Sequence, residues 1–587
     1  MPPDTLPRLA FFLVLAGVLS CGRSPTPPRP SLLLITVDTA RADAYGCYGG
    51  RAATPVTDGL ASEGIQFLQA IAPVPITHPS HASLLTGLYP QRHGIRDNGM
   101  FRLSSELDTL AERLRVAGYR TSAFVSSVVL DSRYGLDQGF ETYDDAILPD
   151  VNPDERRGDL TVNAAIAYLD TLAAGAPLFM WVHLFDPHHP YAPPPPFDST
   201  CHDSPYHGEI AFADQQIGRL VDKFRECRNH VYIVVTSDHG EGLGDHGEVT
   251  HGLFLYQETV RVPLIVVGPD LPRAVEVDAL VSTIDLFATL LAFAGLEPPS
   301  DTDAHSLMDV LSSGTRQAPV LLETLLPHYT YGWSSYLGAT DDRYKLIQGV
   351  QRELYDLKED PGETRNHAEI QPEAMNRLAD WISGMMKRPP LANPDAVALD
   401  AETRRSLESL GYLSAPSPAA NSDYMGGPDP KEMAPYERLL MQGKALLDQG
   451  QLAEAITIFQ RIVSQDPGNP IFREYLGRSL TLRGSYPEAR KHLEKALEKR
   501  PDRPVAVFNL GLCHQALGDL AHAEAAYRTT LKLWPHHVGA TFRLGELMLA
   551  HGRKEEARKW FQDCVEHHPD TKMAEVARQR LRELGGG

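Results

Sequence analysis

The most informative stretch of this chain is Ile76-Thr77-His78-Pro79-Ser80-His81-Ala82-Ser83-Leu84-Leu85-Thr86-Gly87. Residues 79–86 predict a helix, because Pro79 suits a first helical turn. The start of a helix offers backbone N–H donors and the positive end of the helix dipole to an anion. Thr77 is therefore a candidate for contact with an anionic group, whereas an isolated Thr at this position would simply cap the helix.

Around this stretch, residues 31–390 alternate between strand-like and helix-like segments. The strand-like segments are continuous apolar runs, as expected for strands that are buried on both faces of a sheet. The segments between them are long enough for crossover helices. The sequence therefore predicts an α/β domain with a mostly parallel sheet and flanking helices. The predicted strands are Leu32–Val37, Thr121–Val125, Leu178–Leu184, Val231–Thr236, Leu264–Val267 and Val320–Glu323.

Acidic and histidine residues follow three of these predicted strands. Asp38 follows the first, Asp186 follows Leu178–Leu184, and Asp238 with His239 follows Val231–Thr236. One Asp after a strand is usually a helix cap. Three of them meet at the carboxyl edge of a parallel sheet, where ligands bind. Carboxylates together with imidazole suit a divalent metal ion, so the sequence predicts a metal site at this edge.

The motifs taken together resemble those of the sulfatases, within the alkaline phosphatase superfamily. The resemblance covers residues 31–390 and rests on segments 34–43, 76–87, 236–241, 244–252, 262–266 and 353–356. Four positions depart from the sulfatase pattern. Sulfatases carry a Cys or Ser that is oxidised to formylglycine, a second Asp, an Arg and a Lys. This chain has Thr77, Thr39, His81 and His251 at those places.

The resemblance implies one or two divalent cations, Zn²⁺, Mn²⁺ or Ca²⁺. The first would be held by Asp38, Asp238, His239 and the Thr77 oxygen. The second would be held by Asp186, His251 and either His188 or His189. In the alternative, the histidines of segment 183–191 contact the substrate anion without a metal.

The resemblance also implies roles for two further residues. His81 replaces an Arg that supports formylglycine and is a candidate catalytic residue. Asn98 resembles the Asn that binds a non-bridging phosphoryl oxygen in relatives with a Thr nucleophile. The alternative for Asn98 is a turn residue before Gly99.

These residues predict a hydrolase that cleaves a phosphate or sulfate ester through Thr77. Metal coordination would activate its hydroxyl, which is otherwise a weak nucleophile. The four departures occur together and favour phosphoryl over sulfuryl transfer. Two alternatives stay open: a transferase that passes the group to an envelope lipid or glycan, and a non-catalytic sulfatase-like scaffold.

The first 30 residues predict export and anchoring. Residues 1–21 form a signal peptide, in which Arg8 precedes an apolar run too short to span a bilayer. Val18-Leu19-Ser20-Cys21 resembles a bacterial lipobox, which makes Cys21 the lipidation site and residues 22–30 a tether. We therefore expect a periplasmic or surface lipoprotein of a bacterial cell envelope. The alternative is an ordinary secretory signal.

Composition limits the partners and the compartment. The net charge of −21 over 587 residues argues against nucleic acid as a partner, because phosphate backbones attract basic surfaces. In an oxidising compartment Cys201 and Cys227 could pair, and the sequence leaves this open.

Residues 391–433 read as a linker, and residues 434–587 show a period of 34. Pro467, Pro501, Pro535 and Pro569 keep this spacing, as do Gly443, Gly477, Gly511 and Gly545. So do the large residues Phe459, Leu493, Tyr527 and Phe561. This pattern is typical of tetratricopeptide repeats, here four repeats and a capping helix. We expect the repeats to bind a protein or peptide, or else to serve as a spacer.

Overall fold

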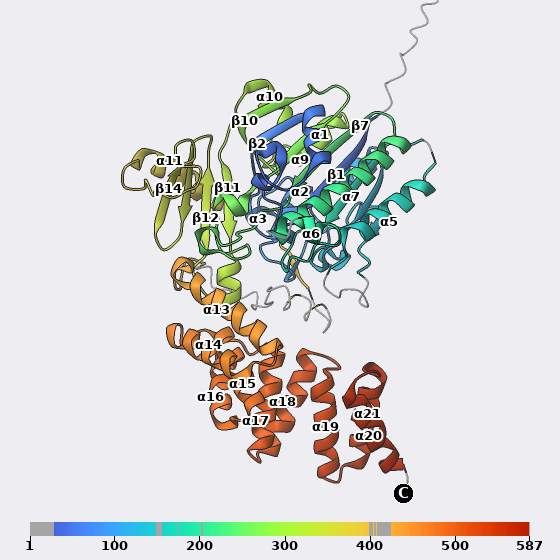
Figure 1. The fold of residues 1–587 in the computed structure, drawn as a ribbon, viewed down its shortest axis with the longest axis vertical. Helices are drawn as coiled ribbons and strands as arrows, with labels where there is room; N and C mark the ends of the chain where they lie inside the picture. The colour runs from blue at the N-terminus through green and yellow to red at the C-terminus, as the bar shows by residue number, and fades with distance from the viewer. Residues whose placement is uncertain are drawn as a thin grey trace, which may run out of the picture.

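The computed structural model describes residues 29–147, 155–173, 175–200, 204–397, 403, 407 and 424–585. A sheet-containing domain is followed by an array of helices that lies below it in Figure 1. The predicted signal peptide, the lipidation residue Cys21 and most of the tether lie outside the described residues, as does Cys201. Cys227 is a free thiol.

The main sheet has nine strands. Its order is β10 (Val275–Ser282), β2 (Ile65–Ile71), β9 (Leu264–Val267), β7 (Val231–Ser237), β1 (Ser31–Val37), β6 (Leu178–Leu184), β4 (Arg120–Phe124) and β5 (Thr142–Asp144), with β8 (Arg261–Val262) beside β2. Central β1 pairs in parallel with both β6 and β7, and every residue of β1 and β6 is buried. β9 is antiparallel to its neighbours. The predicted mostly parallel sheet is confirmed.

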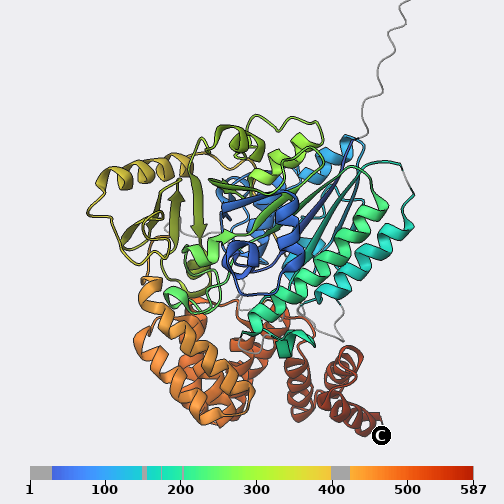
Figure 2. The same ribbon diagram turned by 45° about the horizontal axis from the view of Figure 1, so that its top comes forward.

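Helices cover both faces of this sheet because successive residues of each strand point to opposite faces. Leu33, Ile35 and Val37 of β1 join the core under α1 (Pro55–Glu63), α5 (Gly158–Thr171) and α7 (Pro205–Cys227). Leu32 and Leu34 join the core on the other face, under α2 (Thr77–Thr86), α4 (Leu110–Val116) and α9 (Asp285–Phe293). In Figure 2, α5 and α7 lie together along one side of the sheet.

A second, antiparallel sheet has the order β11 (Val320–Thr324), β12 (Tyr336–Thr340), β13 (Tyr344–Gln348) and β14 (Arg352–Asp356). The predicted strand Val320–Glu323 is thus β11 and belongs here, not to the parallel sheet. Its apolar run is buried because α11 (Pro372–Met386) and the main domain cover this sheet. β15 (Asp395–Ala396), within the predicted linker, pairs with β3 (Phe101–Arg102).

The C-terminal array consists of antiparallel helix pairs and matches the predicted solenoid. The two sequence registers meet in space: a Cβ added to Gly443, Gly477, Gly511 or Gly545 would lie 2.4–2.6 Å from the side chain of Phe459, Leu493, Tyr527 or Phe561. Glycine therefore lets the two helices of each repeat approach around one large side chain. The helices are α13 (Pro430–Asp448), α14 (Leu452–Gln465), α15 (Pro470–Arg483), α16 (Tyr486–Lys499), α17 (Pro504–Ala516), α18 (Leu520–Leu533), α19 (Val538–Ala550), α20 (Lys554–His567) and α21 (Lys572–Gly585).

The array packs directly against the sheet domain. Tyr331 and Trp333 stack on each other at 4.1 Å, and both rings lie against Phe472 of α15. Lys431 Nζ pairs with Glu353 at 2.7 Å. Across the described segments, none of the helices combines the length and apolar character of a membrane span.

Candidate active site

The candidate site lies at the carboxyl edge of the sheet, where β1 and β7 end side by side. Val37 pairs with Ser237, so the next residues, Asp38 and Asp238, leave the sheet together. Thr77 starts α2, all of whose residues are buried. Its Oγ1 lies 3.3 Å from His239 Nε2. The structure therefore brings together Asp38, Asp238, His239 and Thr77, as the sequence predicts for the first metal.

The carboxylates of this group are buried without enough hydrogen-bond donors. His239 Nε2 lies 3.6 Å from Asp38 Oδ1 and 3.6 Å from Asp238 Oδ2. Among the described residues, neither oxygen of Asp38 has a hydrogen-bond partner, and Asp238 Oδ2 also has none. Burial raises the pKa of Asp38 to about 7, although His239 opposes this shift.

Unpaired buried carboxylates are costly unless a cation compensates them. One ligand atom from each of Asp38, Asp238 and His239 lies within 4.8 Å of the others. His239 Nδ1 donates to the Gly240 carbonyl at 3.0 Å, so Nε2 carries the lone pair, which accepts from the Thr77 hydroxyl at 3.3 Å on the side of the carboxylates. This donor set fits a divalent metal ion, which the sulfatase family generally uses.

Asn98 is held beside the start of α2 in a fixed orientation. Its Oδ1 accepts a hydrogen bond from the backbone N–H of His78 at 2.8 Å. Its Nδ2 is buried and has no partner within the described ranges. The Asn98 side chain is therefore held through its oxygen, and its Nδ2 group keeps a hydrogen available for a further acceptor.

His81 occupies both of its ring nitrogens in hydrogen bonds that support α2. Burial lowers its pKa to about 3, so the ring is neutral. Nδ1 must carry the hydrogen, because it donates to the Thr77 carbonyl at 2.8 Å. Nε2 therefore accepts from the Thr36 hydroxyl at 3.0 Å. The sequence predicts a catalytic role for His81, but the structure makes it a positioning residue beneath Thr77.

Asp186, which the sequence predicts as a ligand of the second metal, has its carboxylate at the start of α5. Its Oδ2 accepts a hydrogen bond from the backbone N–H of Gly158, the first residue of α5, at 2.8 Å. A carboxylate there satisfies an otherwise unpaired donor of the helix start. In this structure Asp186 is therefore a helix-capping residue.

The other histidines predicted for a second metal surround a buried carboxyl, Glu241. His251 Nδ1 lies 3.3 Å from Glu241 Oε1, and the rings of His188 and His251 are 5.1 Å apart. His189 lies next to them, and its carbonyl accepts from His188 Nδ1 at 2.7 Å. Burial raises the pKa of Glu241 to about 8 and lowers that of His251 to about 4. This pair can hold and deliver a proton at neutral pH.

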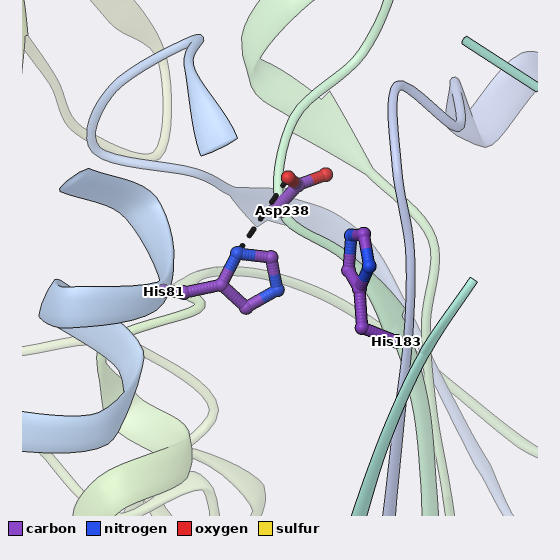
Figure 3. Close-up of side chains that lie close together, drawn as sticks. All are labelled: His81, His183 and Asp238. Carbon is purple, nitrogen blue, oxygen red and sulfur yellow. Dashed lines mark ion pairs between the residues drawn. The ribbon is translucent and has the colours of Figure 1, made fainter. Parts of the chain in front are cut away.

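The sequence-based assignment of site residues misses Glu241, which is the last residue of segment 236–241. It includes His183 only among the histidines of segment 183–191 and not as a neighbour of Asp38, because His183 lies inside the apolar strand β6. Figure 3 shows His183 facing the space beside Asp238 and His81.

The chain was compared with known proteins. Residues 30–296 match the family described as sulfatase, and residues 244–386 match the C-terminal region of N-sulphoglucosamine sulphohydrolase. Tetratricopeptide repeat families match residues 440–504, 508–570 and 480–532. The uncharacterized sulfatase YidJ of Escherichia coli is 26% identical over 443 residues, which cover 60% of this chain and 87% of that protein.

Two further comparisons agree with these matches. The Delta 4,5-hexuronate-2-O-sulfatase of Bacteroides thetaiotaomicron is 25% identical and covers 69% of this chain and 98% of that protein. The solved phosphonate monoester hydrolase of Agrobacterium radiobacter shares the fold, with a TM-score of 0.51 and 22% identity over 61% of this chain and 95% of its own. Residues 30–296 therefore form a sulfatase-type ester hydrolase domain, and the C-terminal array consists of tetratricopeptide repeats.

Proposed function

We propose that this protein is a metal-dependent hydrolase that cleaves phosphate or sulfate esters with Thr77 as its nucleophile. The observation that carries the proposal is the position of Thr77 Oγ1. It lies at the start of α2 and 3.3 Å from His239 Nε2, beside two buried carboxylates with unpaired oxygens. The relatives found by comparison are named as sulfatases, and one structural neighbour is a phosphonate monoester hydrolase.

Asp38, Asp238 and His239 would hold the metal ion, which would lower the pKa of the Thr77 hydroxyl and neutralise charge on the ester. In the first step Thr77 Oγ1 attacks the phosphorus or sulfur atom in line, and its proton passes to Asp38. Asn98 Nδ2 donates a hydrogen bond to a non-bridging oxygen. The bond to the leaving alcohol breaks, and the pair Glu241 and His251 supplies the proton which that oxygen takes.

The second step restores the enzyme. Water attacks the Thr77 ester, and its proton returns to the pair Glu241 and His251. The Thr77 oxygen leaves and regains its proton from Asp38. Thr77 keeps a methyl group where an aldehyde hydrate would carry a second hydroxyl, so the ester must be released by attack at phosphorus or sulfur. Phosphate esters suit this route better, in line with the departures at Thr39, His81 and His251.

We further propose that the protein works in the bacterial cell envelope, anchored through lipid on Cys21, and that its repeats bind a protein or peptide. The sequence of the first 30 residues and the match to tetratricopeptide families support these assignments. Metabolic labelling with a fatty-acid analogue tests the anchor: wild type should be labelled and Cys21→Ala should not.

The catalytic proposal is tested with aryl sulfate, phosphate monoester, phosphate diester and phosphonate monoester substrates, with the metal content measured in parallel. Thr77→Ala should abolish turnover while retaining most metal, and Thr77→Ser should keep activity because it preserves the hydroxyl. Full activity in Thr77→Ala would overturn the nucleophile. Product analysis with added acceptor alcohols separates hydrolysis from group transfer, and an intact protein that binds no metal would favour a scaffold.

A further inference from the structure

His183 is a polar residue in the most buried part of the sheet. It lies one residue before the end of β6, opposite Thr36 of β1, and is fully buried. Neither ring nitrogen has a hydrogen-bond partner within the described part of the chain. Burying an unsatisfied imidazole costs free energy. An unsatisfied imidazole at the edge of the sheet where Asp38 and Asp238 lie is therefore a candidate ligand for a bound ion.

The ring of His183 points at the same carboxylate that His239 faces. His183 Nε2 lies 3.4 Å from Asp38 Oδ2, and His239 Nε2 lies 3.6 Å from Asp38 Oδ1. The His183 ring therefore lies beside one carboxylate oxygen of Asp38, and the His239 ring lies beside the other. Asp238 is also within reach, since one ligand atom each of His81, His183 and Asp238 fall within 4.8 Å of one another (Figure 3).

His81 does not compete for this position. Its Nδ1 donates to the Thr77 carbonyl and its Nε2 accepts from Thr36, so both nitrogens are engaged. Its ring meets that of His183 edge-on, with centroids 5.0 Å apart. The dashed line in Figure 3 joins His81 Nδ1 to Asp238 Oδ2 at 3.7 Å, but that nitrogen already donates to the Thr77 carbonyl. Of the two histidines drawn there, only His183 has ring nitrogens without a hydrogen bond among the described residues.

We propose that His183 Nε2 is a fourth protein ligand of a single cation that Asp38, Asp238 and His239 hold, an inference that rests on the metal dependence proposed above. Thr39, the residue after Asp38, brings a hydroxyl without a partner among the described residues and no third carboxylate to this edge of the sheet. His183 supplies the fourth ligand from the neighbouring strand β6. Two carboxylates with two imidazoles balance one divalent charge and favour Zn²⁺ over Ca²⁺, which prefers oxygen ligands.

The competing reading is that His183 donates a hydrogen bond to Asp38 and never touches the metal. A thiolate at position 183 separates the two readings, because a thiolate bound to Co²⁺ gives a charge-transfer absorption band in the near ultraviolet. The full chain is stripped with a chelator and titrated with Co²⁺ as wild type, His183→Cys and His93→Cys. His93 is a buried histidine that pairs with Ser83 at 2.9 Å, away from the carboxylates.

We expect a new band only in His183→Cys, saturating at the one equivalent that wild type binds. Saturable Co²⁺ binding by wild type and His183→Cys without that band, or the same band in His93→Cys, would overturn the ligand. Failure of wild type to bind Co²⁺ would instead overturn the metal dependence on which the proposal rests.

A second measurement does not depend on the cysteine variant. Titration calorimetry of metal-free protein should show that His183→Ala weakens Zn²⁺ binding at least about 10-fold. Ca²⁺ binding should change less, so the preference for Zn²⁺ should fall. Thermal unfolding of the metal-free variant checks its fold. Unchanged Zn²⁺ affinity in a folded His183→Ala protein would refute the proposal.

Discussion

At the scale of the residue, Asn98 shows how one side chain serves both structure and chemistry. Its Oδ1 is tied to the backbone of His78, while its Nδ2 is buried and unsatisfied by any described residue. In the proposed mechanism, an oxygen of the bound ester accepts a hydrogen bond from this donor and recovers the cost of burying it. Such preorganised donors contribute most where charge develops in a transition state.

Asn98→Asp separates the two roles of this side chain. The variant keeps an oxygen for the His78 N–H but replaces the donor with an acceptor. We expect kcat/KM to fall by about 100-fold or more, because one preorganised donor is worth that much. The melting temperature should fall at neutral pH, because the variant buries a carboxylate with one unpaired oxygen, so kcat/KM is measured well below the melting range of the variant. Wild-type kcat/KM in the folded variant would remove Asn98 from the site.

Asp38 carries a prediction about pH. Its pKa rises from 3.8 to about 7 in the folded protein, mainly because of burial. The folded state therefore holds the proton more tightly than the unfolded state. The resulting stabilisation is complete below about pH 4 and is lost as the pH rises through about 7.

Asp38→Asn cannot ionise, so it does not share this loss of stability. As the pH rises from about 4 to 8, we expect the variant to gain stability relative to wild type by a few kcal/mol at most. Thermal unfolding of both proteins in chelator measures this difference. Adding Zn²⁺ at pH 8 should make wild type the more stable of the two proteins, since only wild type keeps both carboxylates that would hold the ion. A difference that does not vary with pH in chelator would contradict the raised pKa of Asp38.

At the scale of the element, strand ends and helix starts place the functional groups. β1 and β7 end in register and deliver Asp38 and Asp238 together. β6 ends beside them, yet Asp186 turns to the start of α5, and His183, three residues earlier, faces the site. A strand end therefore identifies the edge of the sheet but not which side chain points into it.

Asp186→Ala tests this assignment of roles. Loss of the cap should lower stability by about 1 kcal/mol, with metal stoichiometry unchanged. Asp186→Asn is the matched control, because its amide oxygen can still accept the Gly158 N–H. Unfolding in urea and metal analysis measure the two properties. A loss of one metal equivalent in both variants would restore the prediction of Asp186 as a metal ligand.

At the scale of the whole molecule, the repeat array is part of the folded body rather than a loose appendage. One continuous apolar core runs from the sheet domain into the repeats as far as Cys513, through Trp333 and Phe472. The last repeats form a separate core, which includes Phe561. Asn469 Nδ2 also donates to the Tyr331 carbonyl at 3.2 Å.

These two cores predict two modes of unfolding. Trp333→Ala should destabilise the sheet domain and the first repeats together by about 3–5 kcal/mol. Phe561→Ala should lower only the transition of the terminal repeats, because repeats contact their neighbours alone. Scanning calorimetry of the full chain distinguishes the two. If both variants shifted one and the same transition equally, the prediction that the two cores unfold separately would be wrong.

The sequence by itself determined the fold class, the repeat array and the group Asp38, Asp238, His239 and Thr77. Burial patterns, strand ends and the 34-residue period are local properties that the backbone geometry of strands and helices translates directly into position. The tertiary structure decided the orientation of the side chains. Asp186 turned to a helix start, His81 bound the Thr77 carbonyl, and His183 faced Asp38. Those orientations depend on partners from segments far apart in the chain, and only the packed fold brings such partners together.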